Sequence, residues 1–301
     1  MLKTITWTTN HYTDSHQPHE TDGLFYAQDL FRYRKLQSPL SIKFCLRGNL
    51  NYVSGSQRFS IPAGGFYLAN KGAELECLPN EPGYQALILF FTGELMHDVH
   101  RAFHLGERQL LDVPYTDVEP VHFFEHTYCS PTPLTARLGA VARQMQVENE
   151  SSYALAPDIF YELAEQLLSF QQNTAGRIER IGSQTPAVRR ELYRRVLAAR
   201  EFLYSHWEAN PSLQEVARQA CLSPYHFHRT FKAAFGCSPM RWFRRRKLGK
   251  ARELLQSGQF SISEVALGCG YADLATFSKA FKREWGVSPS GAGSISSLLR
   301  G

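Results

Sequence analysis

Hydrogen-bond donors are grouped in two similar stretches toward the C-terminal end of this sequence. The first, SPYHFHRTFKAAFGCSP at residues 223–239, carries Tyr225, His226, His228, Arg229 and Lys232. The second, TFSKAFKREWGVSP at residues 276–289, repeats its aromatic spacing and its Gly-x-Ser-Pro ending. Donors of these types can pair with the base edges and phosphates of nucleic acid, where Arg suits guanine best.

The second stretch and the two residues before it offer fewer donors at the matching positions. The positions that match Tyr225, His228, Arg229 and Lys232 are occupied by Ala275, Ser278, Lys279 and Lys282, and Leu274 precedes them. Leu274 and Ala275 have side chains that cannot donate a hydrogen bond. We therefore expect hydrogen-bonded reading of a sequence to concentrate in the first stretch.

A shorter helical pattern precedes each donor-bearing stretch. PSLQEVARQACL begins with a capping box formed by Ser212 and Glu215, and SISEVALGCG begins with the same box formed by Ser261 and Glu264. The apolar residues that follow keep helical spacing and then stop at a short turn. The pattern predicts a helix, a tight turn and a second helix, and it occurs twice.

Aromatic residues recur at i, i+4 and i+8 in both donor-bearing helices, as Phe227, Phe231 and Phe235 and as Phe277, Phe281 and Trp285. Such stripes form a core, so the donors must face outward. Two helix-turn-helix units whose second helices enter the major groove explain this arrangement. The alternative is two helical hairpins that merely pack together.

A single helix is expected between the two units, over SPMRWFRRRKLGKARELLQSG at residues 238–258. About seventeen residues at ~1.5 Å each give a rod of ~26 Å. Recognition helices at its ends could reach successive major-groove segments ~34 Å apart. The repeat would then let one chain read two neighbouring turns of one face of DNA.

Charge divides the 301 residues into unlike halves. Residues 1–176 hold 12 Lys and Arg against 19 Asp and Glu, a net of −7, whereas residues 177–301 hold 21 against 9, a net of +12. A basic half predicts a polyanionic partner, of which double-stranded DNA is the commonest, although a solvated basic face is the alternative.

Residues 186–289 resemble the DNA-binding domain of the AraC/XylS family of bacterial transcription regulators. The similarity covers both units, the linking helix and GYADLATFSKAFKREWGVSP, which looks like the family signature. It implies base contacts by Tyr225, His228 and Arg229, then by Leu274, Ala275, Ser278 and Lys279. It also implies an activator with RNA polymerase as a partner. Cys221 and Lys247 depart from the Gly and Arg that are usual in the family.

The N-terminal half shows short apolar or alternating runs between Ser41 and Phe91, separated by turn residues. This pattern is typical of an antiparallel barrel or sandwich. It resembles the cupin-like sensor domain of many AraC/XylS regulators. The expected fold is therefore α+β, with a cupin-like antiparallel β-barrel and appended helices at 1–172, a linker at 173–186, and an all-α DNA-binding domain of two helix-turn-helix units at 187–301.

No metal or other cofactor is expected in the N-terminal domain. Metal-binding cupins carry a histidine after the Pro-x-Gly turn, where this sequence has Tyr67. Two groups of histidines follow the strand region, namely His97, His100 and His104, and then His122 and His126. The first three could share a helical face and hold a metal, but solvent-facing histidines are the commoner case.

Two amphipathic helices are expected at 133–148 and 156–171. The apolar stripe of the second includes Leu163 and Leu167 and is either domain core or a dimer seam. The family resemblance favours a homodimer through this helix.

Composition sets further limits. The six cysteines form no Cys-x-x-Cys pair, no apolar run reaches eighteen residues, and the first residues lack the apolar core of a secretion signal. We expect a cytoplasmic, DNA-binding transcription regulator that answers to a small-molecule or protein effector. The alternatives are a cupin-type enzyme fused to a DNA-binding domain, and an architectural DNA protein.

Overall fold

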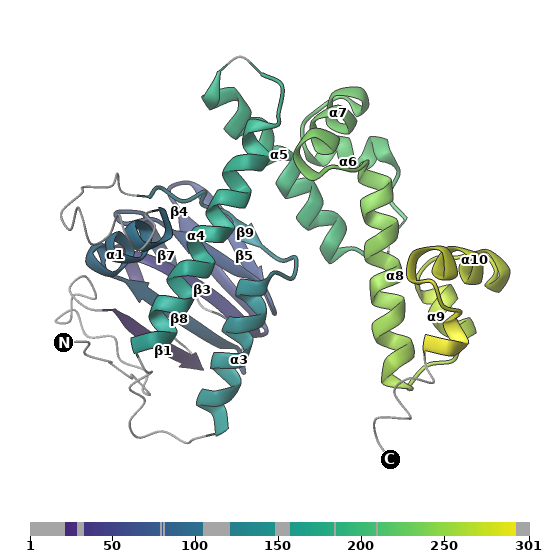
Figure 1. Cartoon of the computed structure of the whole chain (residues 1–301), viewed down its shortest axis with the longest axis horizontal. Coiled ribbons are helices and arrows are strands. Elements are labelled where there is room, and N and C mark those ends of the chain that lie inside the picture. The colour runs from purple at the N-terminus through teal and green to yellow at the C-terminus, as the bar shows by residue number, and fades with distance from the viewer. Residues whose placement is uncertain are drawn as a thin grey trace. The chain divides into compact units, whose positions relative to one another are not determined.

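The computed structural model describes residues 22–28, 33–78, 80, 82–104, 121–147, 157–183, 185–208 and 210–292 (Figure 1). The chain divides into two compact units, residues 1–175 and residues 176–301. Within the described ranges, every helix is too short or too polar to cross a membrane.

The first unit contains two antiparallel sheets. One has the strand order β1-β8-β3-β6-β9 and the other has the order β2-β7-β4-β5. The strands are β1 Gly23–Gln28, β2 Tyr33–Gln37, β3 Leu40–Arg47, β4 Asn49–Ser54, β5 Gln57–Pro62, β6 Phe66–Ala69, β7 Glu74–Cys77, β8 Gln85–Phe91 and β9 Thr127–Tyr128. The antiparallel pattern expected between Ser41 and Phe91 is confirmed.

The two sheets pack face to face around an apolar core. Residues two apart in a strand share one face, and this core takes Leu50 and Tyr52 from β4 and Leu75 and Cys77 from β7. Residues of the other sheet meet them, namely Cys45, Tyr67, Ala69 and Ala86. Among the described strands the two sheets are not hydrogen-bonded into a closed barrel, so the structure supports antiparallel sheets rather than the barrel that the sequence suggested.

Helices cover the opposite face of the five-stranded sheet. Figure 1 shows α3 (Pro133–Val147) and α4 (Pro157–Glu179) lying across it, with α1 (Gly93–His104) at one end. The ring of Phe170 on α4 makes edge contacts with Phe66 at 5.5 Å and with Tyr128 at 4.8 Å between centroids. Because this face is also buried, β8 is apolar nearly throughout as QALILFF.

Leu163 and Leu167, predicted to form a dimer seam, are each 0% exposed within the single chain. The prediction was wrong for these residues because the apolar stripe of α4 packs inside its own unit. The periodicity of a helix shows that one face is buried, but it does not show what covers that face.

The predicted linker also differs from the structure. Helix α4 continues to Glu179, so the first seven residues of the expected 173–186 linker are helical. The sequence QQNTAGRIE is polar, yet it contains no proline that would end a helix, and Ile178 is buried. The boundary between the two units, at residues 175 and 176, falls inside α4.

The second unit is all helical and consists of two helix-turn-helix arrangements with one long helix between them. Its helices are α5 Pro186–Ser205, α6 Leu213–Gln219, α7 Pro224–Phe235, α8 Pro239–Ser257, α9 Ile262–Gly268 and α10 Leu274–Trp285. Both predicted capping boxes are present, Ser212 with Glu215 and Ser261 with Glu264. Local sequence signals therefore place these helix starts correctly.

The linking helix α8 spans nineteen residues and ends at Gly258, which has a φ of 70°. Ser238 stands at its N-cap position, but its side chain makes no capping hydrogen bond. The C-terminal half of α8 packs against α9 and α10 through Leu248, Ala251 and Leu255. The linking helix is therefore part of the core of the second helix-turn-helix.

Candidate nucleic-acid interface

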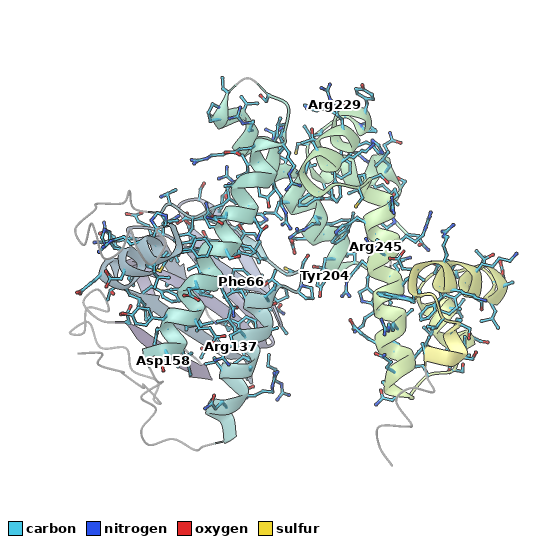
Figure 2. All side chains as sticks on the ribbon, viewed as in Figure 1. Phe66, Arg137, Asp158, Tyr204, Arg229 and Arg245 are labelled. Carbon is cyan, nitrogen blue, oxygen red and sulfur yellow. The ribbon has the colours of Figure 1, made fainter. Side chains whose placement is uncertain are left out.

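Helix α7 presents one polar face and buries the other. Ser223 Oγ accepts a hydrogen bond from the backbone N–H of His226 at 3.3 Å, and Pro224 is the first helical residue. Phe227 and Phe231 are fully buried, which turns the opposite face outward. All five predicted contact residues are exposed, namely Tyr225 at 78%, His226, His228, Arg229 and Lys232. Figure 2 shows Arg229 on the outer side of α7.

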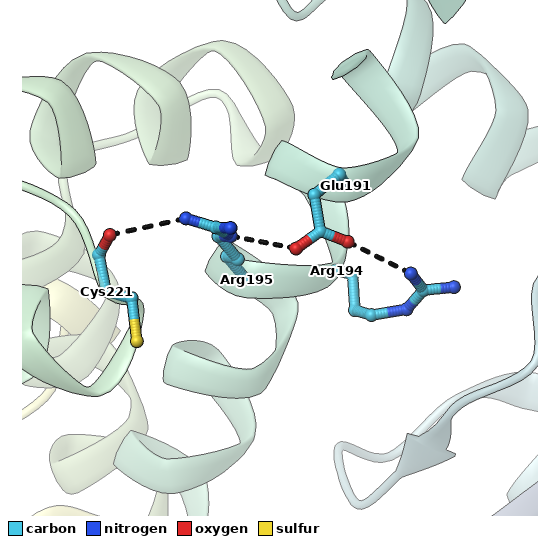
Figure 3. Close-up of polar contacts among 4 residues, drawn as sticks. All are labelled: Glu191, Arg194, Arg195 and Cys221. Atoms are coloured by element: carbon cyan, nitrogen blue, oxygen red, sulfur yellow. Dashed lines mark hydrogen bonds and ion pairs between the residues drawn. The ribbon is translucent and has the colours of Figure 1, made fainter. Parts of the chain in front are cut away.

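The turn before α7 is held to α5 by a short polar chain (Figure 3). Glu191 accepts from Arg194 at 3.0 Å and from Arg195 at 2.8 Å, and Arg195 Nη1 donates to the carbonyl oxygen of Cys221 at 3.4 Å. The hydrogen bond from Arg195 is the main cause that lowers the pKa of the Glu191 carboxyl. These contacts connect α5 to the turn that precedes α7.

Helix α10 repeats this arrangement with a different outer face. Asp273 Oδ1 accepts from the backbone N–H of Thr276 at 2.7 Å, and Phe277 and Phe281 are fully buried. The predicted contact residues Leu274, Ala275, Lys279 and Lys282 are exposed, whereas Ser278 is half-buried. Leu274 is 45% exposed although it is apolar. The second recognition helix thus begins with two apolar side chains.

Contacts with α8 fix the position of α10. Arg245 Nε pairs with Glu284 Oε1 at 2.6 Å, and the Trp285 Nε1–H donates to the carbonyl oxygen of Leu248 at 3.2 Å. The guanidinium of Arg252 lies 4.9 Å from the centroid of the Trp285 ring. Together these contacts join the C-terminal end of α10 to the middle of the linking helix.

Lys247, which stands where the family usually has Arg, lies inside the second unit. Its side chain is 5% exposed, and its Nζ donates to Asn210 Oδ1 at 2.5 Å. Burial lowers the pKa of this ammonium group, against a smaller opposing effect of Cys269. Lys247 is therefore an internal contact rather than a part of the outer basic surface.

Further exposed cations, which were not predicted as contacts, add to the basic surface. Arg218 on α6, Arg241 and Arg244 on α8, and Arg283 on α10 are all exposed. The run RWFRRRK shows in the sequence that α8 is basic. Which of its Arg and Lys side chains face water depends on helical phase and on ion pairs. Arg246, for example, lies 3.9 Å from the ring centroid of Tyr204.

The N-terminal histidines do not converge with other ligands in the described structure. His97 and His100 lie on α1, while the side chain of His104 is outside the described set and His122 and His126 lie near β9. No group of three or more His, Cys, Asp or Glu side chains suited to a metal occurs among the described residues. Tyr67 is 7% exposed, and its ring stacks on Phe59 at 4.4 Å between centroids.

A buried lysine on β3 faces the space between the two sheets. Lys43 is 2% exposed, and its Nζ donates to Ser41 Oγ at 2.6 Å and to Ser38 Oγ at 3.2 Å. Burial lowers the pKa of Lys43 to about 7, although the nearby Cys77 and Glu125 act in the opposite direction. Sequence patterning did not identify this group, because a lysine in an alternating strand is normally assigned to the solvent face.

Comparison with known proteins places the second unit in a family. The helix-turn-helix domain family matches residues 216–292. Curated relatives include the transcriptional activator RhaS of Escherichia fergusonii, 38% identical over 88 residues, and RhaS of Escherichia coli O139:H28, 36% identical over 88 residues. Residues 216–292 therefore match a helix-turn-helix domain, and these curated relatives are transcriptional activators. Each match covers 29% of this chain and 32% of the relative, so the similarity spans about a third of the relatives' length.

Several solved structures are also similar to the chain over different shares of its length. The C-terminal domain of AraT from Geobacillus stearothermophilus is 32% identical, with a TM-score of 0.32, and covers 34% of this chain and 84% of that one. The DNA-binding domain of AdpA, solved in complex with a target DNA, is 24% identical with a TM-score of 0.34, and the match covers 35% of this chain and 95% of that one. ToxT from Vibrio cholerae, solved with an unsaturated fatty acid bound, is 12% identical with a TM-score of 0.32, and the match covers 90% of this chain and 93% of that one.

Proposed function

We propose that this protein is a sequence-specific DNA-binding transcription regulator that activates genes in response to a signal sensed by its N-terminal unit. The observation that carries the proposal is the pair of capped recognition helices, α7 and α10, which bury aromatic stripes and expose all predicted contact residues except the half-buried Ser278, on a unit with an excess of positive charge. Backbone N–H groups at helix starts, Arg and Lys all suit contacts to a polyanion.

The linking helix gives the two recognition helices a spacing that suits DNA. Nineteen residues of α8 at ~1.5 Å each make a rod of about 28 Å. Two successive major-groove segments on one face of the duplex are about 34 Å apart. We propose that α7, which precedes the start of α8, and α10, which packs against the middle of α8, occupy those two segments, so that one chain would bind a site of two blocks.

The first unit is proposed to be a cupin-like sensor domain that also dimerises, with independently folding domains near residues 1–172 and 187–301. Two packed antiparallel sheets with a buried core are compatible with such a domain. The effector is a small molecule or another protein. A homodimer would have to use residues other than Leu163 and Leu167, which are buried within one chain. RNA polymerase is the proposed second partner because RhaS is a transcriptional activator.

Selection of duplexes from a random pool by the full-length protein tests the function. We expect enrichment of one sequence with two conserved blocks whose centres lie about 10 bp apart. A double variant, Arg229→Ala with Lys279→Ala, should show weaker enrichment while its helical circular dichroism stays unchanged. Glu165→Ala, at an exposed position of α4, serves as the control.

The outcome of the selection separates the proposal from its alternatives. Retention of duplexes without a shared sequence would favour an architectural DNA protein. A reporter gene placed beside the selected site should be transcribed more strongly with the wild-type protein than with the double variant. Lower transcription with the wild-type protein would show repression instead. A cupin-type enzyme would be supported by a bound metal in stoichiometric amount.

A further inference from the structure

The first turn of α10 exposes apolar side chains at the place where α7 exposes donors. Leu274 is 45% exposed and Ala275 is also exposed. At the matching position of Ala275, helix α7 has Tyr225, which is 78% exposed. The two recognition helices share a backbone arrangement but differ in the chemistry of the surface that they present.

The polar groups near the start of α10 are already bonded to each other. Asp273 Oδ1 accepts from the Thr276 backbone N–H, and Asp273 Oδ2 accepts from the Thr276 hydroxyl, both at 2.7 Å. These bonds lower the pKa of the Asp273 carboxyl. The first turn therefore offers mainly Leu274 and Ala275 to a partner.

The surroundings of this apolar turn favour a polyanion as its occupant. Lys279, Lys282 and Arg283 are exposed on the same helix. The base edges of the major groove carry one apolar group, the C5-methyl of thymine, and apolar side chains make contact with it. An exposed leucine in the first turn of a helix whose later turns are basic is thus suited to contact a thymine methyl while the cations contact phosphates.

We propose that α10 reads thymine through its C5-methyl group, with Leu274 and Ala275 as the specificity-determining residues. This inference rests on the proposed DNA-binding function and deepens it. Helix α7 recognises its block by hydrogen bonds, and α10 recognises its block by apolar contact. The second block of the operator therefore contains at least one thymine whose methyl group contributes to affinity.

Replacement of thymine by deoxyuridine in the selected duplex tests the proposal, because it removes only the methyl group. The block read by α10 is the one in which Arg229→Ala relaxes the preference at no base pair. Within that block, replacement of at least one thymine by deoxyuridine should weaken binding by about three- to tenfold, as expected for the loss of one buried methyl group. The same replacement in flanking DNA should change affinity less than twofold.

A protein variant connects the methyl effect to its residue. Leu274→Ala should weaken binding to the thymine duplex and reduce the deoxyuridine penalty to less than twofold. Leu267→Ala is the matched control, since Leu267 is 74% exposed on α9 and lies outside the recognition helix. It should leave the deoxyuridine penalty intact. The thermal transition of each variant checks that it folds.

Each outcome bears on the proposal. A second block without thymine, a lack of deoxyuridine penalty in that block, or a penalty that Leu274→Ala leaves unchanged would overturn it, while sequence-specific binding would still support the proposed function. The deoxyuridine arm uses the wild-type protein, so it decides the matter even if Leu274→Ala fails to fold. Failure of the wild-type protein to select any sequence would overturn both proposals.

Discussion

Arg229 and Lys282 are both exposed cations on recognition helices, but their shapes suit different contacts. The planar guanidinium of Arg can pair with two acceptors of guanine, whereas the ammonium of Lys acts as a point charge toward phosphate. Arg229 follows Tyr225 by one helical turn, so both side chains lie on one face. If Arg229 contacts a base, Tyr225 would therefore also lie within reach of the major groove.

Arg229→Ala should cost about 1–3 kcal/mol of binding free energy at the selected site and relax the preference at one base pair. Lys282→Ala should weaken binding to all sequences about equally and reduce the salt slope by about 1. Binding-site selection and titrations with both variants measure these effects. If Arg229→Ala binds more weakly but keeps the same preferred sequence, Arg229 contacts phosphate only.

Lys43 is the residue whose titration should change the stability of the N-terminal unit. Its pKa is about 7 in the folded chain against 10.5 in the unfolded chain, so between these values the folded state binds fewer protons. The free energy of unfolding should therefore rise as the pH increases from 7 toward 10, and the full penalty of burying the charge applies below pH 7. The groups near the ammonium are Ser38, Ser41, Cys77 and Glu125.

Lys43→Met should remove this pH dependence and stabilise the protein at pH 6 by about 2–4 kcal/mol, because one unit of pKa corresponds to about 1.4 kcal/mol. Urea unfolding followed by circular dichroism at several pH values measures the effect. Lys71→Met, at an exposed position of the same unit, is the control and should change little. A Lys43→Met protein that is less stable at pH 6 would contradict the assignment.

At the scale of elements, the turns of the two helix-turn-helix units share a left-handed backbone conformation at one position, but a different residue type adopts it in each unit. Cys221 has a φ of 51° and Gly270 a φ of 72° at the matching positions. A left-handed conformation strains any residue with a Cβ, and glycine avoids that strain. The glycine position is also crowded, because a Cβ at Gly270 would collide with the amide nitrogen of Asn210.

Cys221→Gly should stabilise the second unit by about 0.5–1 kcal/mol, since relief of strain exceeds the added freedom of the unfolded chain. Gly270→Ala should destabilise it by about 1–3 kcal/mol, because it adds strain and displaces Asn210 from Lys247. Thermal unfolding under reducing conditions compares the two variants with the wild type. Equal stabilities for all three would show that the turns relax around either residue.

Helix α4 belongs to the core of the first unit along its apolar stripe. Leu163→Glu should lower the stability by about 3–5 kcal/mol, because it buries a charge without a partner. Tyr161→Glu, on the same helix but 43% exposed, should change stability by less than about 0.5 kcal/mol. Urea unfolding and light scattering of both variants test this prediction. A Leu163→Glu protein that is folded and monomeric would instead support the assignment of this apolar stripe to a dimer interface.

The contrast between these elements shows what the sequence could predict. The helix starts of the second unit depend on neighbouring residues, so Ser212, Glu215, Ser261 and Glu264 were sufficient to locate two of them. The aromatic stripes fixed the outer faces of α7 and α10 for the same reason. The burial of Leu163 depends on packing against a sheet whose strands are distant in the sequence, and helical periodicity contains no information about that partner.

The candidate site was predictable to a similar degree. Exposure of Tyr225, Arg229 and Lys279 follows from helical phase, and the structure agrees with it. The half-buried state of Ser278, the burial of Lys43 and the pairing of Arg245 with Glu284 could not be predicted. They depend on tertiary packing between elements, which single-sequence patterns do not describe.

For the whole molecule, the uneven charge has a measurable consequence. Residues 177–301 carry a net charge of +12, and residues 1–176 carry −7. With about six phosphate contacts, the logarithm of the DNA association constant of the full-length protein should fall with a slope of about −5 against the logarithm of salt concentration. Titrations between 50 and 200 mM salt measure the slope, and an affinity that does not respond to salt would contradict DNA binding through this surface.

The length of α8 also restricts how a binding site for this protein can change during evolution. Because Arg245, Leu248 and Arg252 hold α10 against α8, the separation of the two recognition helices does not adapt easily to a new spacing. One base pair inserted between the two blocks would rotate the second block by about 34° around the duplex axis. Substitutions inside a block would tune affinity gradually, whereas a single inserted nucleotide would remove one recognition helix from its groove. The two blocks and their spacer would therefore be inherited as one unit.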